Sequence, residues 1–166
     1  RRLRPTLLGP WKSMNEQLNI LVVDDDERIL EVFQDFFDKK EAYAVLMARN
    51  GFEALETCEQ ARIDFCFTDL NMPGMDGTEL VRRIHGVDNT MPVVVMTGFP
   101  SADSAISTLR NGVVDFLVKP FKINEIEFTI RRALEKRALF VENMFLKKEI
   151  KSKERLKSVN KKLSEK

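Results

Sequence analysis

The sequence of 166 residues contains few of the residues that mark metal, redox or membrane proteins. Its two cysteines, Cys58 and Cys66, lack the C-x-x-C spacing of a metal or redox site and are interpreted as reduced structural thiols. The single histidine, His85, lacks metal-ligand spacing and is interpreted as a surface or helix-end residue. The longest apolar runs are strand-sized, far below the roughly 20 residues of a membrane helix. We therefore expect a soluble, cytoplasmic protein.

Glycine and proline are also scarce, with 7 and 6 residues, while 43% of the residues are apolar. This composition supplies enough hydrophobic material for one globular core. The charge is unevenly distributed, because residues 20–130 hold 10 Lys and Arg against 20 Asp and Glu, whereas residues 131–166 hold 13 against 5. A segment of net charge −10 is thus followed by one of net charge +8, which predicts two different structural parts.

The first 13 residues, RRLRPTLLGPWKS, are basic and directly precede Met14. They lack the apolar stretch of about 7 to 15 residues that a signal peptide requires. We expect residues 1–13 to be vector-derived or upstream sequence that does not belong to the fold.

Short apolar runs and stretches with helical spacing alternate along the middle of the chain. The runs rich in β-branched residues are predicted strands and lie at residues 20–23, 43–48, 65–68, 92–96 and 116–118. Each is followed by apolar residues at helical spacing, as in Ile29, Phe33 and Phe36. Strands this apolar leave neither face of a sheet exposed to water, so the pattern predicts a doubly wound α/β fold with a five-stranded parallel sheet.

Polar side chains occur where these strands end. In an open parallel sheet the functional crevice lies beyond the carboxyl ends of the strands, so residues at those ends are candidates for a site. The candidates are the carboxylates Asp24, Asp25, Asp26 and Asp69, the hydroxyl of Thr97 and the ammonium of Lys119.

Clustered carboxylates must protonate or recruit a cation, since two unit charges about 4 Å apart interact by about 4 kcal/mol at an effective dielectric of about 20. Mg²⁺ suits this set of groups because it is held by one or two carboxylates together with phosphate oxygens. In such a site Lys119 would neutralise a phosphoryl oxygen and Thr97 would donate a hydrogen bond to another. Asp69 is left as the nucleophile.

The residues after Asp69 predict a shaped loop. Pro73 and Gly74 suit the central positions of a type II turn, and Asp76 followed by Glu79 has capping-box spacing for the next helix. The first residues of this loop would bring the backbone carbonyl of Asn71 towards the metal.

Four separated stretches, ILVVDDDERIL, FTDLNMPGMDG, VVVMTG and DFLVKPF, resemble in order and spacing the receiver domain of bacterial two-component response regulators. The resemblance covers residues 18–136. It implies a flavodoxin-like sheet of strand order 2-1-3-4-5 in a phosphoacceptor regulatory domain rather than an enzyme with an external substrate. The implied partner is a sensor histidine kinase or phosphotransfer protein, whose phosphohistidine supplies the phosphoryl group.

The resemblance assigns roles to individual positions. Asp69 matches the phosphoacceptor, and Thr97 and Lys119 match the hydroxyl and ammonium that sense the phosphoryl group. Phe116 matches the aromatic switch position. The remaining matches are Asp24 and Asp25 as Mg²⁺ ligands, Asn71 as a ligand through its carbonyl, and Pro120 as the residue after a cis peptide bond with Lys119.

Each candidate also has a purely structural interpretation. Asp24 to Asp26 have the composition of a helix N-terminus, and Asp26 is expected to cap the helix that begins near Glu27. Thr97 alone is an ordinary strand-end residue, Lys119 alone a solvated charge, and Phe116 alone a core side chain.

Two other functions fit part of the pattern. A haloacid-dehalogenase-type phosphatase would use Asp24 as nucleophile and Asp26 as second acid, but would leave Asp69 without a role. A degenerate receiver would serve only as a protein-interaction scaffold. Steady hydrolysis of a phosphate ester would favour the phosphatase, and a failure to bind Mg²⁺ or phosphoryl analogues would favour the scaffold.

The C-terminal region predicts one long helix. Asn124 with Glu127 has capping-box spacing, and no breaker follows before Lys166, so the helix can extend about 60 Å. Beyond residue 136 its apolar positions form two seams that do not share one heptad register, as in an imperfect coiled coil. These seams are Leu139, Leu146 and Ile150, and Leu156, Val159 and Leu163.

We expect residues 137–166 to be a helical or coiled-coil linker, with a solvated single helix or frayed tail as the alternative for residues 151–166. The chain is expected to form a homodimer through this helix. It is expected to be part of a longer regulator whose output domain is absent, with a stand-alone regulator that carries a dimerising tail as the alternative. Linkers of this kind join receivers to ATPase, PAS, kinase or cyclase modules. Direct nucleic-acid binding by the lysines is not expected, because no reading motif or interleaved aromatic residues accompany them.

Overall fold

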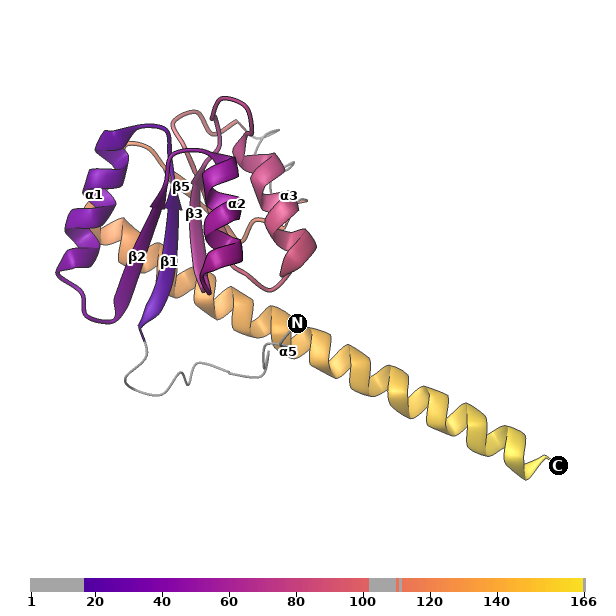
Figure 1. The fold of residues 1–166 in the computed structure, drawn as a ribbon. Coiled ribbons are helices and arrows are strands. Elements are labelled where there is room, and N and C mark those ends of the chain that lie inside the picture. The colour runs from indigo at the N-terminus through magenta and orange to yellow at the C-terminus, as the bar shows by residue number, and fades with distance from the viewer. Residues whose placement is uncertain (1–16, 102–109, 111, 166) are drawn as a thin grey trace.

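The computed structural model describes residues 17–101, 110 and 112–165. Five parallel strands form one sheet in the order β2-β1-β3-β4-β5 (Figure 1). The strands are β1 (Leu18–Val23), β2 (Tyr43–Ala48), β3 (Phe65–Asp69), β4 (Val93–Thr97) and β5 (Asp115–Val118). The predicted fold class and strand order are confirmed.

Helices cover both faces of the sheet because its strands are apolar on both sides. Along β1, Leu21 and Val23 face the core that contains α2 (Gly51–Gln60) and α3 (Gly77–Val87). The intervening Ile20 and Val22 face the second core, which contains α1 (Glu27–Asp38) and α5 (Ile123–Ser164). This alternation follows from the two-residue period of a strand, and it leaves the ends of the strands as the place for polar chemistry.

Polar side chains start the helices beside the carboxyl ends of the strands. Asp26 caps α1 and accepts a hydrogen bond from the backbone N–H of Arg28. Asp76 caps α3 and accepts one from the N–H of Glu79 at 2.8 Å, as the capping-box spacing predicts. The helix expected between β4 and β5 falls mainly on residues 102–109 and 111, which lie outside the described residues.

The start of α5 differs from the prediction. Asn124 lies inside the helix, and the N-cap is Lys122, whose N–H donates to the Glu125 carboxylate at 2.6 Å. Glu127, the predicted partner of Asn124, instead accepts from Lys40 Nζ at 3.0 Å. The predicted cap at Asn124 is therefore wrong by two residues.

The first part of α5 packs on the domain and the second part extends away from it (Figure 1). Lys136 Nζ donates to the Val114 carbonyl at 3.1 Å, and Arg137 Nε donates to the Thr90 carbonyl at 2.9 Å. Beyond these contacts α5 continues to Ser164, so its 42 residues span about 63 Å. Among the described residues, no helix is long and apolar enough to cross a membrane.

Gly77 allows α3 to start directly against the end of β3. A Cβ at this position would overlap the carbonyl oxygen of Asp69 and lie 3.0 Å from Leu70 Cα. Gly77→Ala is expected to lower the free energy of unfolding by about 1–3 kcal/mol, the usual cost of overpacking. The matched control is Gly86→Ala in the same helix, where a Cβ meets no atom within 4 Å. This control should instead raise stability by about 0.5–1 kcal/mol.

Urea denaturation of the two variants measures this difference. Equal effects of the two substitutions would show that the contact at Gly77 does not constrain the fold.

Candidate functional site

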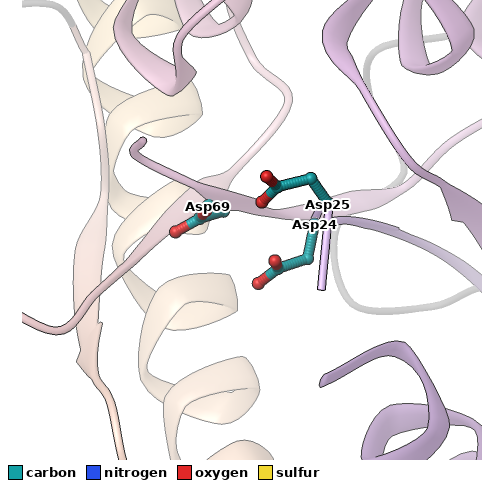
Figure 2. A group of neighbouring side chains, drawn as sticks. All are labelled: Asp24, Asp25 and Asp69. Atoms are coloured by element: carbon teal, nitrogen blue, oxygen red, sulfur yellow. The ribbon is translucent and has the colours of Figure 1, made fainter. Parts of the chain in front are cut away.

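Three carboxylates meet where β1 and β3 end. Asp69 is the last residue of β3, and Asp24 and Asp25 follow β1 directly. One oxygen from each carboxylate lies within 4.8 Å of the other two (Figure 2). Asp24 is fully buried and Asp69 is 7% exposed, whereas Asp25 is exposed. The predicted convergence at the carboxyl ends of β1 and β3 is therefore present in the structure.

Lys119 bridges two of these carboxylates from the end of β5. Its Nζ lies 2.6 Å from Asp24 Oδ2 and 3.1 Å from Asp69 Oδ1. Its backbone N–H donates to the Thr97 carbonyl at 2.8 Å, which continues the pairing of β5 with β4 by one residue. Burial lowers the pKa of Lys119, but the ion pairs with Asp24 and Asp69 outweigh this effect and raise the pKa above its ordinary value. The ammonium is thus held in its charged form.

The environment of Asp69 is unfavourable to its negative charge. Burial and the nearby charge of Asp24 raise the pKa of Asp69, with a smaller contribution from Asp25. The hydrogen bond and charge of Lys119 act in the opposite direction without cancelling the shift. Any further positive charge that enters the site would stabilise the charged form of Asp69.

Asp26 lies outside the carboxylate cluster. Its side chain caps α1 and binds the Arg28 guanidinium, with Nε at 3.1 Å and Nη2 at 2.9 Å. Its backbone N–H donates to Asp24 Oδ1 at 2.9 Å and so fixes the orientation of that carboxylate. The capping role expected for Asp26 is observed, and its carboxylate is paired with Arg28.

Thr97 and Phe116 lie on neighbouring strands beside the cluster. Thr97 is 2% exposed, and its Oγ1 accepts a hydrogen bond from the Phe99 N–H at 3.2 Å. Phe116 is half-buried and packs against the core on the α2 and α3 side of the sheet. The pairing of Val95 with Phe116 brings the two strands into register here. Because a hydroxyl can accept and donate at the same time, the predicted donation from Thr97 to a phosphoryl oxygen does not compete with the Phe99 contact.

The loop after Asp69 turns at Gly74, whose φ is +81°, as a glycine at this place allows. The Met75 N–H donates to the Pro73 carbonyl at 3.0 Å, which is the i→i+2 bond of a three-residue γ-turn and not the i→i+3 bond of the expected type II turn. The Gly77 N–H closes the loop on the Leu70 carbonyl at 2.8 Å. Asn71 is exposed in this loop, and the role of its carbonyl stays a prediction. The Lys119–Pro120 peptide bond is cis.

The donors present fit a hard divalent cation. Three carboxylates supply oxygen atoms within 4.8 Å of one another, and Lys119 is the only ammonium or guanidinium that pairs with Asp24 or Asp69 in the described part of the chain. Two buried carboxylates and one exposed carboxylate thus face one ammonium. Mg²⁺ prefers such oxygen donors and keeps waters that a phosphate oxygen can replace.

The remaining residues singled out in the sequence have structural surroundings. Cys66 is buried in β3, where burial raises the pKa of its thiol, and Cys58 is half-buried in α2. His85 Nε2 lies 2.9 Å from the Met91 carbonyl oxygen near the end of α3. The sequence analysis missed Gly77, although a glycine that follows a capping aspartate at the end of a strand and loop is a signal of close packing.

Fold and site together define a doubly wound domain with a cluster of carboxylates and one lysine at the carboxyl edge of its sheet. The family model described as the response regulator receiver domain matches residues 20–131. The chain belongs to this family and is a receiver domain of a two-component response regulator in phosphorelay signalling.

Curated relatives differ in how much of their length this chain spans. It is 35% identical over 119 residues to the transcriptional regulatory protein ZraR of Klebsiella oxytoca, covering 72% of this chain and 27% of that protein. It is 31% identical over 147 residues to the C4-dicarboxylate transport transcriptional regulatory protein DctD of Pseudomonas aeruginosa, covering 84% and 30%. It is 34% identical over 121 residues to the sporulation initiation phosphotransferase F of Bacillus subtilis, covering 73% and 95%.

Solved structures share the fold of this domain. The chemotaxis protein CheY4 of Vibrio cholerae is 28% identical with a TM-score of 0.68, covering 71% of this chain and 99% of that one. The beryllofluoride-activated NtrC4 receiver domain dimer is 29% identical with a TM-score of 0.66, covering 72% and 98%. The chain thus spans nearly all of these receiver structures but under a third of ZraR and DctD.

Proposed function

We propose that Asp69 accepts the phosphoryl group in this receiver domain. Its position between the acidic pair and Lys119 is the observation that carries the proposal. A carboxylate oxygen of Asp69 attacks the phosphorus of a phosphohistidine. The new P–O bond forms as the P–N bond breaks, and the leaving imidazole takes up a proton. Phosphoryl labelling by acetyl phosphate, a small-molecule donor, tests the assignment.

The other residues of the site position and neutralise the phosphoryl group. Lys119 already lies 3.1 Å from Asp69 Oδ1, so its ammonium can pair with an oxygen of a group attached there. Thr97 ends the neighbouring strand and donates its hydroxyl hydrogen to a second phosphoryl oxygen. Asp24 is held by the Asp26 N–H and by Lys119, so its carboxylate is oriented before the phosphoryl group arrives.

Asp24, Asp25 and Asp69 are the residues that would hold Mg²⁺, with the Asn71 carbonyl as a further ligand. Bound there, the ion supplies positive charge that offsets both the carboxylates and the incoming phosphoryl oxygens. The domain would thereby catalyse only its own phosphorylation and dephosphorylation, in the cytoplasm where we place it.

The donor is a sensor histidine kinase or a phosphotransfer protein, the partners with which receiver domains of this family interact. The family match and the similarity to the sporulation initiation phosphotransferase F support this partner class. The C-terminal part of α5 is proposed to connect residues 18–136, the receiver unit, to a controlled output. DctD supports this role, because its similarity extends over 147 residues and it is a transcriptional regulatory protein by name.

Phosphorylation of Asp69 is proposed to change the packing of the domain. Thr97 would move towards the phosphoryl group and vacate space that Phe116, now half-buried, turns to fill. This alters the surface formed by β5, α5 and the expected fourth helix, which lies outside the described residues. Since α5 continues from this surface, the change reaches its projecting half.

We propose that this change alters the packing of a homodimer that forms through α5. Leu139, Leu146 and Ile150 are 45–62% exposed and form an apolar seam that a second copy can cover. Size-exclusion chromatography with light scattering is expected to give a dimer for the chain and a monomer for a version ending at Lys136. Each is measured with and without beryllofluoride, a phosphoryl analogue.

Beryllofluoride should change the elution volume of the dimer without dissociating it. If the chain is monomeric in both states at micromolar concentration, α5 is not a dimerisation element and this mechanism fails.

A further inference from the structure

The last three turns of α5 carry an apolar stripe that nothing covers among the described residues. Leu156, Val159 and Leu163 are 64%, 51% and 68% exposed and recur at intervals of three and four residues. At about 100° per residue, this stripe lies about a third of a turn around the helix from the Leu139, Leu146 and Ile150 seam. A homodimer formed through that first seam would therefore leave the distal stripe pointing away from the dimer interface and exposed to solvent.

Basic residues border the distal stripe on one side with heptad spacing. Lys148, Arg155 and Lys162 lie seven residues apart, and the last two directly precede Leu156 and Leu163. All three side chains are exposed. With Leu156 and Leu163 at the a positions of a heptad, these residues occupy the g positions that face a partner helix.

The other border of the stripe is also without acidic residues. Lys153 and Asn160 occupy the e positions, seven residues apart. Of the nearby acids, Glu149 pairs with Lys153 at 3.1 Å, and Glu154 lies at an f position on the opposite side of the helix. The e and g positions, which select the partner in a coiled coil, are therefore basic or neutral from residue 153 onward.

A second copy of this chain is a poor partner for such a stripe. In a parallel pair Lys148 would face Lys153 of the other copy, and in an antiparallel pair g positions would face g positions, so like charges meet either way. A register that continues from Leu139 and Leu146 places Lys153 of both copies in the core of the seam. Each arrangement brings like charges together, which interfaces avoid.

We propose that the distal segment of α5, residues 148–163, binds an amphipathic helix of another protein whose apolar seam is bordered by acidic residues. The narrow stripe with three- and four-residue intervals matches a helix seam. Residues 147–163 contain no aromatic side chain, although membrane-bound amphipathic helices commonly insert aromatic residues. They also lack the aromatic interleaving expected of a nucleic-acid surface. An acidic helix satisfies both the stripe and the basic border.

The probe for this surface is a synthetic peptide with leucine at its a and d positions and glutamate at e and g. Fluorescence anisotropy should detect its binding to the whole chain, and a peptide with lysine at e and g should bind at least about tenfold more weakly. Raising the salt concentration from about 50 to about 500 mM should lower the affinity for the acidic peptide by about tenfold, because exposed charge pairs are screened. Binding should persist in Asp69→Asn, since this surface does not rest on phosphorylation.

Two triple variants with the same change of net charge distinguish binding at the stripe from nonspecific electrostatic attraction to the helix. Lys148→Glu/Arg155→Glu/Lys162→Glu alters the border of the stripe and should lower affinity at least about tenfold. Lys147→Glu/Lys157→Glu/Lys161→Glu alters the opposite side and should leave the affinity within about twofold, because screening by salt limits the effect of distant charges. Circular dichroism establishes that both variants keep the helix.

Three results would overturn the proposal. The first is no binding of the acidic peptide to the unaltered chain, and the second is an equal loss in the two triple variants. The third is tighter binding of duplex DNA or anionic phospholipid vesicles than of the peptide, which would assign the segment to a nucleic acid or a membrane surface.

Discussion

Replacing Asp69 with asparagine should abolish phosphoryl labelling by acetyl phosphate and Mg²⁺. The neutral amide of asparagine lacks the anionic oxygen that attacks phosphorus, while its shape stays close to that of the carboxylate. Labelling is expected to fall to the background of a reaction without protein, as measured by intact-mass spectrometry. The matched control is Asp26→Asn, which removes a neighbouring carboxylate outside the cluster and keeps a capping side chain. This control should label like the unaltered chain.

Asp69→Asn is not expected to unfold the domain. Burial and the charge of Asp24 raise the pKa of Asp69 above its ordinary value of 3.8, so the folded domain binds its proton more tightly than the unfolded chain. The stability that this proton contributes is complete below the unfolded pKa and is lost as pH rises through the folded pKa. At neutral pH without metal the charged Asp69 therefore opposes folding. The substitution removes that charge, and the thermal midpoint should stay equal or rise.

Asp25→Ala should weaken Mg²⁺ binding by at least about 100-fold, since even the loss of an outer partner of a metal ligand costs about 10- to 100-fold in affinity. Asp25 is the exposed member of the cluster, so its removal leaves the buried contacts of Asp24 and Lys119 in place. Isothermal titration calorimetry with Mg²⁺ measures the change. Asp26→Asn again serves as control, because it also removes one negative charge but should change the affinity little.

Phosphoryl labelling should also require the divalent ion. Without it, an anionic phosphoryl donor meets two buried carboxylates and one exposed carboxylate that Lys119 alone cannot neutralise. Excess chelator should therefore reduce labelling to background. Undiminished labelling in chelator, or equal Mg²⁺ affinity of Asp25→Ala and Asp26→Asn, would rule out the metal role of this cluster.

The sheet could be predicted from the sequence because its strands are short, apolar on both sides and separated by helical spacing. Their boundaries were less accurate, since β1 starts at Leu18 and β5 at Asp115 rather than at residues 20 and 116. The three additional residues, Leu18, Asn19 and Asp115, have part-buried side chains at strand ends, where hydrophobicity gives little signal. Hydrogen bonds to neighbouring strands, which a single sequence does not display, set those ends.

The site was predictable for a similar reason. A parallel sheet brings the carboxyl ends of its strands to one edge, so Asp24, Asp69 and Lys119 could be placed together without knowing any distance. The exclusion of Asp26 from the cluster also followed from its place as a helix cap. Which carboxylate pairs with Lys119 depends on side-chain orientation, and only the structure shows that Asp24 lies closer than Asp69.

Contacts between residues far apart in the chain could not be predicted from the sequence. The cap of α5 was misplaced because Glu127 forms an ion pair with Lys40, which lies 87 residues earlier in the chain. The need for Gly77 likewise arises from the Asp69 carbonyl and not from local turn preference. Local patterns fix which elements form, whereas contacts between elements decide where they begin and which side chains remain available.

Mapping the phosphorylated residue in the unaltered chain is the most direct test that Asp69 is the phosphoacceptor. After labelling with acetyl phosphate and Mg²⁺, borohydride converts an aspartyl phosphate to homoserine. Trypsin cuts after Arg28, Arg62 and Arg82, so residues 63–82 form a peptide separate from the one that contains Asp24 and Asp25. Tandem mass spectrometry should place homoserine at position 69 alone. Homoserine at position 24 or 25, or at neither peptide despite a gain in intact mass, would contradict the assignment.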